Sequence, residues 1–327
     1  MTGVRRYAGW ARSTLSPRER LLPGLGERLA GQPRLAAAVL SAVRRVPGRR
    51  LRAATERNVS RPLLTRMVTE LDVRVSDGFR IRVDTTEAIG RALAVTGKWE
   101  PHVAVAFRRL LSPGDVVIDI GANIGYHTLL AAKLVGTSGH VYAIEPGAGA
   151  FAALTVNVAL NDLSNVTALP VAAGADESEA ILDDRPWGHS LHSFVRREGE
   201  SREPRVEGSP IRVRPVAAVV QPEHLARLRL IKVDVEGYDL EVLQGLLPLY
   251  AAGARPALVI ELHLKAANPL PVLQGLSSEF NLEAYTLYDE DRAERSSAWL
   301  TRPVELSTAS AFGREPHVLL LPRRARD

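Results

Sequence analysis

The segment Gly114-Asp115-Val116-Val117-Ile118-Asp119-Ile120-Gly121-Ala122-Asn123-Ile124-Gly125 is the most informative part of this 327-residue chain. Its apolar run is typical of a buried parallel strand, and the glycines that follow predict a tight turn that opens a helix. We expect Gly121 to let the backbone approach a ligand and Gly125 to let the helix pack closely on the sheet. The helix N-terminus would offer N–H groups to a carboxylate, and Asp119 is suited to a cationic amine.

The spacing of this turn leaves three interpretations. A carboxylate and an ammonium group together are the amino-acid end of S-adenosylmethionine, which is the ligand that we expect. The dinucleotide fingerprint G-x-G-x-x-G lacks its middle glycine, because Asn123 occupies that position, so a nicotinamide or flavin dinucleotide is the second interpretation. In the third, the turn binds no ligand and Asp119 accepts hydrogen bonds from backbone amides.

Apolar strand-like segments alternate with helical segments along the rest of the chain. This rhythm predicts an α/β fold with a doubly wound, mainly parallel sheet whose two faces are covered by helices. In such sheets, ligands bind beyond the carboxyl ends of the strands. The expected strands are Val116–Ile120, His140–Ile144, Val166–Val171, Leu230–Val233, Ala257–Leu262, Leu282–Leu287 and His317–Leu321, and the expected helices are Gly125–Val135, Ala148–Leu160, Leu240–Tyr250 and Pro271–Phe280.

Charge and pattern divide the chain into three parts. Residues 1–66 contain 15 Arg and three Glu, which gives a basic, mostly helical arm of charge +12; because the whole chain is +5, the remainder carries −7. Residues 67–112 predict a hairpin around Ser76-Asp77-Gly78 and a helix leading into the core. Residues 113–327 form the expected cofactor-binding domain. Within it, Asp176–Pro210 is rich in charge, Gly and Pro, and predicts an insertion or lid loop.

Composition excludes several classes of protein. The chain has no cysteine, which excludes disulfides, thiolate nucleophiles and Cys-ligated metals. A content of 46% hydrophobic and 24% charged residues is typical of a globular protein rather than a disordered one. No apolar stretch approaches the ~20 residues of a membrane span, and the N-terminus lacks a signal-peptide pattern, so we expect a cytoplasmic location.

Acidic residues follow three of the expected strands. Glu145, with Pro146 after it, ends the second strand 26 residues beyond Asp119, where a carboxylate can accept the two hydroxyls of a ribose. Asp234 and Glu236 follow a later strand and lie two residues apart, so that in an extended chain they share a face. Glu261 and His263 end the neighbouring strand.

With these segments the chain resembles the FkbM-type family of class I S-adenosylmethionine-dependent methyltransferases. The matching stretches are residues 114–136, 139–146, 231–245 and 259–263, within a similar region of roughly residues 95–323. The resemblance implies a seven-stranded, Rossmann-like sheet with an antiparallel last strand. It implies a cofactor site that includes Asp119, Gly121, Asn123 and Glu145, to which our reading of the residues adds Gly125 and Pro146. Where family members often carry Thr-Leu-Asp, this chain has Val216-Ala217-Ala218-Val219.

The resemblance also implies methyl transfer, mostly to hydroxyl oxygens of sugars, polyketides or glycolipids. Such a reaction needs close alignment and a group that accepts the hydroxyl proton. We expect Asp234 or Glu236 to be the base, with His263 as a third candidate, although Glu236 could instead cap the following helix. His127 is expected to pack beneath the cofactor. His189 and His192, in the insertion, would contact substrate only if that segment closes as a lid.

Other ligands and functions were weighed on the same residues. Asp234, Glu236, Glu261 and His263 could hold a hard divalent cation, but no compact ligand motif is present and we do not favour a metal. Alternative functions are an NAD(P)-dependent oxidoreductase and a catalytically silent binding module.

The expected partner is a small-molecule or glycan acceptor. It would be contacted by the arm, by the insertion and by residues near Trp99-Glu100-Pro101-His102. The basic arm could touch an anionic surface, but only Tyr7 and Trp10 lie in it as aromatic residues, which does not favour nucleic acid. The sequence favours no particular oligomeric state.

Overall fold

The computed structural model of the chain describes residues 70–183, 194–197, 208–263, 268–287, 304, 306 and 317–323. The predicted basic arm, residues 1–66, and the histidines His189 and His192 lie outside the described residues. The chain divides into two compact units, Met1–Trp99 and Glu100–Asp327. All the segments that carry the cofactor and strand-end motifs belong to the second unit.

The described part of the first unit is a hairpin followed by a helix. Strands β1 (Glu70–Arg74) and β2 (Arg80–Asp84) pair antiparallel, with alternate residues buried. Helix α5 (Ala88–Thr96) ends at Gly97, whose left-handed φ of 72° suits glycine. A hairpin and a helix thus lie where the sequence predicts them, the helix having been expected over residues Thr85–Thr96. The helix begins a few residues late because the Thr86 hydroxyl and amide both donate to the Asp84 carboxylate in a turn.

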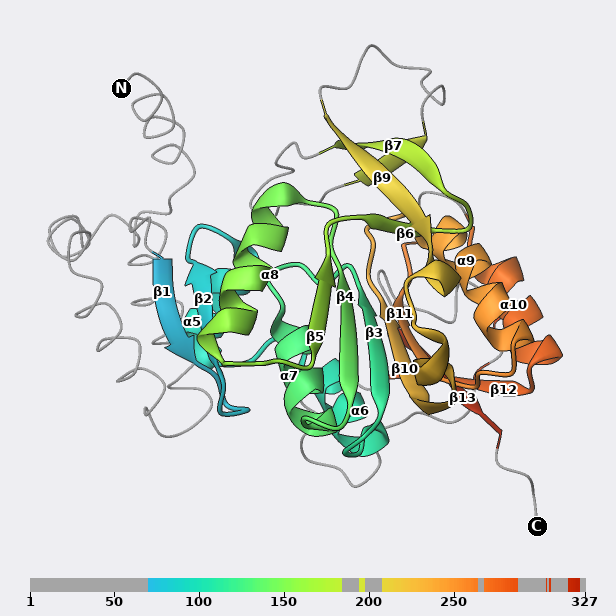
Figure 1. The fold of residues 1–327 in the computed structure, drawn as a ribbon, viewed down its shortest axis with the longest axis horizontal. Coiled ribbons are helices and arrows are strands. Elements are labelled where there is room, and N and C mark those ends of the chain that lie inside the picture. The colour runs from blue at the N-terminus through green and yellow to red at the C-terminus, as the bar shows by residue number, and fades with distance from the viewer. Residues whose placement is uncertain are drawn as a thin grey trace, which may run out of the picture. The chain divides into compact units, whose positions relative to one another are not determined.

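Seven strands form the main sheet of the second unit, in the order β12-β13-β11-β10-β3-β4-β5 (Figure 1). Strand β13 runs in the direction opposite to the other six strands of this sheet. The strands are β3 (Val116–Ile120), β4 (His140–Ile144), β5 (Val166–Leu169), β10 (Leu228–Val233), β11 (Ala257–Glu261), β12 (Leu282–Thr286) and β13 (His317–Pro322). Each coincides with a predicted strand to within two residues at either end. The expected doubly wound, class I order with an antiparallel last strand is confirmed.

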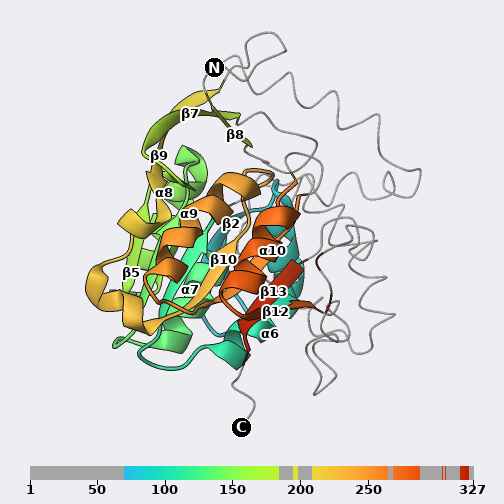
Figure 2. The same cartoon turned by 90° about the vertical axis from the view of Figure 1, so that its right-hand side faces the viewer.

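Helices cover both faces of this sheet. One face packs against α9 (Asp239–Ala251) and α10 (Leu270–Glu279), which lie side by side and contribute leucines to a large core with Ile118, Ile120 and Ile231 (Figure 2). On the other face, Ala143 packs against Leu154 of α8 (Ala148–Leu160). Ala143 and its neighbours along β4 face opposite sides of the sheet, because successive side chains of a strand point to opposite faces.

Two more helices lie in the described part of the second unit. Helix α7 (Tyr126–Val135) follows β3 as predicted. Helix α6 (Pro101–Leu110) was not among the predicted helices, although a proline at its first turn and buried Val103, Ala106 and Phe107 are typical of an amphipathic helix. Within the described part of the chain, no helix has the length and apolar character needed to cross a membrane.

A second, smaller sheet follows the carboxyl end of β5. Its order is β6-β9-β7-β8, from β6 (Ala172–Gly174), β7 (Ser178–Asp183), β8 (Phe194–Arg197) and β9 (Ser209–Pro215). The segment Asp176–Pro210, for which an insertion or lid loop was predicted, therefore contains strands. The many charged residues of this segment made it resemble a loop. Along β7, however, side chains alternate with a period of two residues: Ala180 and Leu182 are buried, while Glu179 is exposed. After β9, Val216 enters the large core in a short 3₁₀ turn.

Candidate active site

The turn after β3 is fixed by the ends of its neighbours. Gly121 has φ 76°, and a Cβ there would lie 1.7 Å from the main-chain oxygen of Asp234. Gly125 has φ 93°, and a Cβ there would lie 2.6 Å from Cδ1 of Leu154. The glycines are thus required by the chain after β10 and by α8, whereas ligand approach and packing on the sheet were the predicted reasons. No side chain caps α7 at Gly125, so the helix N-terminus retains its capacity for an anion.

Glu145 lies against this turn at the end of β4. Its Oε2 accepts a hydrogen bond from the Asn123 amide at 2.8 Å, and its Oε1 accepts one from the Gly147 amide at 2.8 Å. Pro146 lies between Glu145 and Gly147 in the chain. The structure therefore brings together three of the predicted cofactor residues. Burial raises the pKa of Glu145 to about 7, although the two amide hydrogen bonds oppose that rise.

Asp119 is fully buried beneath the turn. Its Oδ2 accepts a 2.6 Å hydrogen bond from the Thr128 hydroxyl of α7. Its register partner on β10 is Lys232, whose Nζ lies 3.6 Å from Oδ1. The cationic amine beside Asp119 in this structure is therefore that of Lys232, a residue that the sequence reasoning did not single out.

Lys232 also connects Asp119 to Asp234. Its Nζ lies 3.2 Å from Asp234 Oδ2 and 3.5 Å from the main-chain oxygen of Gly121. Burial alone would lower the pKa of Lys232, but Asp234 and Asp119 outweigh it and raise that pKa. Burial by contrast opposes the ionisation of Asp234, and Lys232 outweighs it so that the pKa of Asp234 is lowered. The pair is therefore ionised at neutral pH, and the Asp234 side chain keeps 23% of its surface exposed.

His263 lies between two carboxylates. Its Nε2 is 3.3 Å from Glu236 Oε2, and its Nδ1 is 3.6 Å from Oδ1 of Asp239, the first residue of α9. Burial would lower the pKa of His263, but Asp239 and Glu236 outweigh it and raise the pKa to about 11. The imidazole is therefore protonated at neutral pH, and it holds the residues after β10 against the end of β11.

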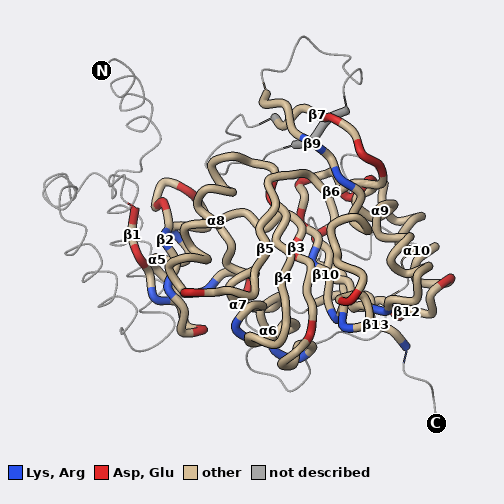
Figure 3. Tube along the Cα trace, in the orientation of Figure 1, with Lys and Arg blue, Asp and Glu red and all other residues tan. Residues whose placement is uncertain are grey.

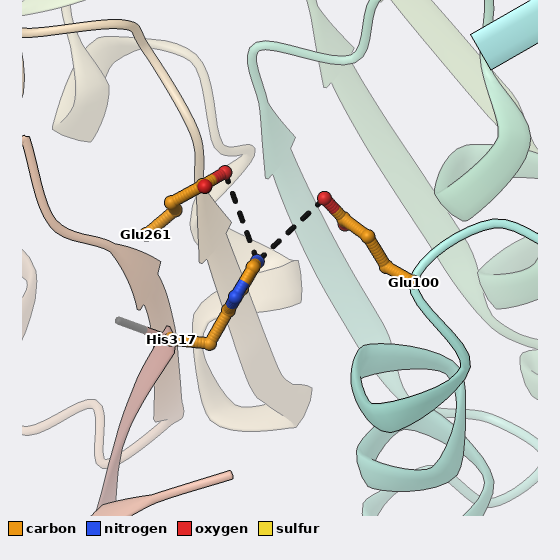
Figure 4. Close-up of side chains that lie close together, drawn as sticks. All are labelled: Glu100, Glu261 and His317. Carbon is orange, nitrogen blue, oxygen red and sulfur yellow. Dashed lines mark ion pairs between the residues drawn. The ribbon is translucent and has the colours of Figure 1, made fainter. Parts of the chain in front are cut away.

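A third group of side chains lies beside these two. Because β13 is antiparallel, its first residue, His317, is the register partner of Glu261 at the carboxyl end of β11. The His317 ring points between two carboxylates, with Nε2 3.7 Å from Glu261 Oε2 and 3.6 Å from Glu100 Oε1 (Figure 4). Burial raises the pKa of Glu261 to about 8, and Asp234 adds to that rise.

Two further histidines surround this group. His102 Nε2 lies 3.0 Å from His317 Nδ1, and burial lowers the pKa of His102 to about 3. His102 is therefore neutral and accepts the hydrogen bond that His317 donates. His127, on α7, is 5% exposed and packs against the rings of Phe107 and Tyr126. Burial lowers the pKa of His127 well below its ordinary value, so its 3.7 Å approach to Glu100 Oε2 is not an ion pair.

The backbone at this edge of the sheet is strained. Five non-glycine residues of the described chain have positive φ, and three of them lie here: Glu100 (40°), Asn123 (49°) and Glu236 (52°). Each left-handed residue of this kind costs on the order of 1–3 kcal/mol and persists only where its surroundings impose it. Figure 3 shows acidic positions at this end of the strands. Strain and buried charge together are typical of a functional site.

The smaller sheet flanks the same edge. A Cβ at Gly147 would lie 3.9 Å from Cδ2 of Leu182 on β7, and a Cβ at Gly174 on β6 would lie 4.0 Å from the Tyr238 hydroxyl. The β6–β9 sheet therefore begins beside Glu145 on one side and beside the residues after β10 on the other. An acceptor molecule at this edge would meet the smaller sheet.

Sequence reasoning missed three residues of the site, Lys232, Asp239 and His317, and named Glu100 only as part of a segment expected to contact the acceptor. His317 could have been predicted, because an antiparallel last strand places its first residue at the carboxyl edge of the other strands. Lys232 stands in a buried strand, where an unpaired ammonium is costly, and that alone indicated a carboxylate partner. No local pattern places Glu100, which precedes a helix that was itself not predicted.

A cavity of about 740 Å³ lies at the opposite, amino-terminal edge of the sheet and is not part of this site. Its three arginines already donate to main-chain oxygens: Arg227 to Gly114 and Ser138, Arg229 to Leu110, and Arg255 to Tyr250 and Ala254. They serve to satisfy carbonyl groups at turns and helix ends.

Comparison with known proteins identifies a domain within the second unit. Residues 119–278, which extend from the buried Asp119 into α10, match the methyltransferase FkbM domain. The chain therefore contains a methyltransferase FkbM domain, which spans 160 of its 327 residues. The segments 114–136, 139–146, 231–245 and 259–263, which carried the resemblance, are those that build this edge of the sheet, and the FkbM protein described here is a methyltransferase.

Two known proteins and one solved structure show what this chain is similar to. Hexuronic acid methyltransferase AglP of Haloferax volcanii is 28% identical over 201 residues, which cover 61% of this chain and 75% of that protein. Methyltransferase 1 of Beauveria bassiana is 26% identical over 148 residues, which cover 40% of this chain and 57% of that protein. A solved SAM-dependent methyltransferase from Aquifex aeolicus is 13% identical, with a TM-score of 0.35 and coverage of 68% and 88%.

Proposed function

We propose that this methyltransferase transfers a methyl group from S-adenosylmethionine to a hydroxyl oxygen of a sugar or a related small molecule. The observation that carries the proposal is the contact of Glu145 with the Asn123 amide, one turn away from the exposed part of Asp234. This contact supports the proposal because a carboxylate suited to a ribose and the N-terminus of α7 then lie at the same edge of the sheet as Asp234.

The residues at this edge fit the cofactor. Both Glu145 oxygens accept one amide hydrogen bond each, which leaves lone pairs for the hydroxyls of a ribose. The uncapped N-terminus of α7 suits the carboxylate of the amino-acid end. Asp119 is fully buried and paired with Lys232, so we propose that it supports the turn from beneath. Gly121 and Gly125 shape the turn after β3, and Pro146 follows Glu145 in the turn after β4.

The chemistry requires a proton acceptor near the methyl group. When bound, S-adenosylmethionine supplies an electrophilic methyl group on a sulfonium; the methyl–sulfur bond breaks as the methyl–oxygen bond forms. Asp234 accepts the proton of the attacking hydroxyl. Its position is set by its own main chain, whose N–H donates to the Ile120 oxygen at 3.0 Å beside the glycine turn. Such positioning contributes more to the rate than the strength of the base.

The structure favours Asp234 over the other two predicted bases. His263 is protonated at neutral pH, because its pKa is raised to about 11, and a protonated imidazole cannot accept a proton. Glu236 pairs with His263 at 3.3 Å and is better placed to hold that imidazole. Asp234 is ionised through Lys232 and remains partly exposed. We therefore assign His263 and Glu236 to positioning rather than to proton transfer.

The acceptor is proposed from position and from one relative. The smaller sheet and the segment that carries Glu100 and His102 border the edge where the acceptor must lie. AglP, the similar protein from Haloferax volcanii, is named for methylation of a hexuronic acid. We propose that this chain likewise methylates a carbohydrate hydroxyl, bound between the smaller sheet and the ends of β10 and β11.

Calorimetric titration tests the cofactor proposal. We expect S-adenosylhomocysteine to bind the wild-type chain and NAD to give no heat. Replacing Glu145 by alanine should weaken S-adenosylhomocysteine binding by about 1–3 kcal/mol, because it removes a hydrogen-bonded carboxylate. The matched control is Glu279→Ala, on the exposed end of α10, which should leave the affinity unchanged.

The other outcomes separate the alternatives. Binding of NAD without S-adenosylhomocysteine would support an oxidoreductase. Heat from neither ligand would support a catalytically silent binding module. If S-adenosylhomocysteine binds equally well to the Glu145→Ala variant, Glu145 does not contact the ribose.

A further inference from the structure

Glu100, Glu261 and His317 present three potential metal ligands to one point. One carboxylate oxygen of each glutamate and one ring nitrogen of His317 lie within 4.8 Å of one another, and the three side chains are largely buried. Nε2 of His317 is 3.6 Å from Glu100 Oε1 and 3.7 Å from Glu261 Oε2. Ligand atoms at about 2.1 Å from an octahedral ion are about 3.0 Å apart where they are adjacent, so a contraction of the group would close the site.

The His317 ring is already oriented for this role. Its Nδ1 lies within hydrogen-bond distance, 3.0 Å, of Nε2 of His102, and its Nε2 faces the two carboxylates (Figure 4). Metal-binding histidines usually donate their second ring N–H to a neighbouring acceptor in this way, which fixes the tautomer and the ring orientation. His102 therefore acts as the supporting residue of the group.

Buried polar atoms that point into the group have no hydrogen-bond partner among the described residues. They include Oε2 of Glu100, Nε2 of His317 and Nε2 of His127. His127 is 5% exposed, and its neutral ring directs Nε2 toward Glu100 Oε2 at 3.7 Å. Buried polar atoms are normally paired, so this set indicates a ligand that the protein itself does not supply.

A second set of possible ligands shares Glu261 but is already engaged. Asp234, Glu261 and His263 also lie close enough for one ion. However, both nitrogens of His263 face carboxylates, Glu236 and Asp239, and Asp234 pairs with Lys232. Nδ1 of His263 and Nε2 of His317 both lack a hydrogen-bond partner among the described residues, but the ring of His317 is also held by a further histidine, His102.

The charge of this edge also favours a cation. Six carboxylates and one lysine lie at this edge of the sheet, so carboxylates outnumber the fixed positive charge there. The carboxylates are Glu100, Asp119, Asp234, Glu236, Asp239 and Glu261. Carboxylates gathered in a buried setting are costly unless positive charge compensates them, and a divalent cation would supply such charge.

We propose that Glu100, Glu261 and His317 bind a divalent cation, and that this site favours Mn²⁺. Two carboxylates and one imidazole suit an ion between the hard Mg²⁺ and the softer Zn²⁺. The site lies beside Asp234, the residue that accepts the hydroxyl proton in the proposed reaction. A cation there would bind the acceptor oxygen and lower the pKa of its hydroxyl. The binding site itself does not depend on the identity of the methyl donor.

The test is Mn²⁺ binding to the full chain after removal of metals with EDTA. Loss of the free-ion electron paramagnetic resonance signal measures binding, and we expect about one tight equivalent per chain. Glu100→Gln, Glu261→Gln and His317→Gln should each weaken binding by at least about tenfold, and His102→Ala should weaken it on the order of 10–100-fold through loss of the supporting contact. The controls Glu279→Gln, on the exposed end of α10, and His140→Gln, at the amino end of β4, should bind as the wild type does.

A spectroscopic readout identifies the histidine. Electron spin-echo modulation of the bound Mn²⁺ should show a nitrogen ligand that is lost in His317→Gln and retained in His263→Gln. The absence of a tight site, equal binding by all the variants, or loss of the nitrogen signal in His263→Gln instead would each overturn the proposal.

Titration with S-adenosylhomocysteine on the same samples keeps the two proposals apart. A chain that binds the nucleoside but not Mn²⁺ overturns the metal site and leaves the proposed function standing. A chain that binds Mn²⁺ at His317 but not the nucleoside supports the metal site and overturns the proposed cofactor. Nucleoside binding by each variant also shows that it has folded.

Discussion

At the scale of single residues, Asp234 combines two tasks. Its main chain packs against Gly121, and its side chain is held ionised by Lys232. Asp234→Asn preserves the shape of the side chain but cannot accept a proton. We expect the turnover number for a methylated acceptor to fall by about 10²–10⁴, with S-adenosylhomocysteine affinity unchanged. The turnover is measured as release of S-adenosylhomocysteine with an acceptor sugar whose product is one methylene heavier.

Asp162→Asn is the matched control for that variant. Asp162 is exposed after α8 and has a left-handed φ of 53°, which asparagine also adopts. Its turnover should equal that of the wild type. Full turnover in Asp234→Asn would transfer the role of base to Glu236.

Glu145 makes the stability of the protein depend on pH. Its pKa is raised from 4.5 to about 7 in the folded chain, so between these values the folded state binds more protons than the unfolded state. The contribution of Glu145 to the free energy of unfolding is therefore present at low pH and is lost as the pH rises through 7. Glu145→Gln cannot ionise. Its free energy of unfolding, relative to the wild type, should rise by about 1–3 kcal/mol between about pH 5 and about pH 8.

Urea denaturation at several pH values measures this difference. Any constant offset reflects the altered hydrogen bonds to the Asn123 and Gly147 amides, so only the change with pH is the readout. Glu279→Gln, an exposed control, should show no such change. A flat difference for Glu145→Gln as well would mean that the folded carboxyl has an ordinary pKa.

At the scale of elements, the turn between β3 and α7 tolerates no side chain at its first glycine. A Cβ at Gly121 would overlap the Asp234 main-chain oxygen at 1.7 Å, and the φ of 76° is unfavourable for alanine. We expect Gly121→Ala to lower the free energy of unfolding by more than about 3 kcal/mol, measured by urea denaturation.

Gly149→Ala supplies the contrast. Gly149 lies in the first turn of α8 with no atom within 4 Å of a Cβ, so the same substitution should be neutral or raise the free energy of unfolding by up to about 1 kcal/mol. Similar effects at both glycines would mean that the chains after β3 and β10 are not in close contact.

The elements that sequence predicted well are those whose pattern reflects burial on both sides. Runs such as Val116–Ile120 and Ala257–Glu261 are apolar because both faces of a central parallel strand are covered. Strands β7 and β9 were missed because the smaller sheet has one exposed face, and its charged residues resemble a loop. The strand-end acids were found because a parallel sheet gathers its carboxyl ends, whereas the approach of Glu100 depends on tertiary packing that no local pattern reveals.

At the scale of the whole molecule, the predicted three-part division can be tested by truncation. Every residue of the proposed cofactor and metal sites lies between Glu100 and His317, within the second compact unit. A chain of residues 67–327 should therefore bind S-adenosylhomocysteine with the affinity of the full chain, measured by calorimetry. Because residues 1–66 carry +12 and the remainder −7, the truncated chain should lose any binding to vesicles that contain phosphatidylserine.

Weaker nucleoside binding after truncation would contradict the predicted boundary at residue 66. Equal vesicle binding by the two chains would contradict a role for the basic arm at an anionic surface. A parallel measurement at high salt distinguishes charge attraction, which salt weakens, from insertion of apolar side chains.

The close approach of Asp234 to Gly121 has a consequence for how this protein could acquire a new acceptor. The peptide group of the proposed base abuts the turn proposed for the methyl donor, so the alignment of those two parts is built into adjoining backbone rather than into adjustable side chains. Selection or engineering can then rework the smaller sheet, β7 and β9 above all, without disturbing that alignment. Acceptor recognition and the reaction thus depend on different parts of the chain. A library of variants confined to the smaller sheet is therefore the first choice in a search for altered acceptor preference.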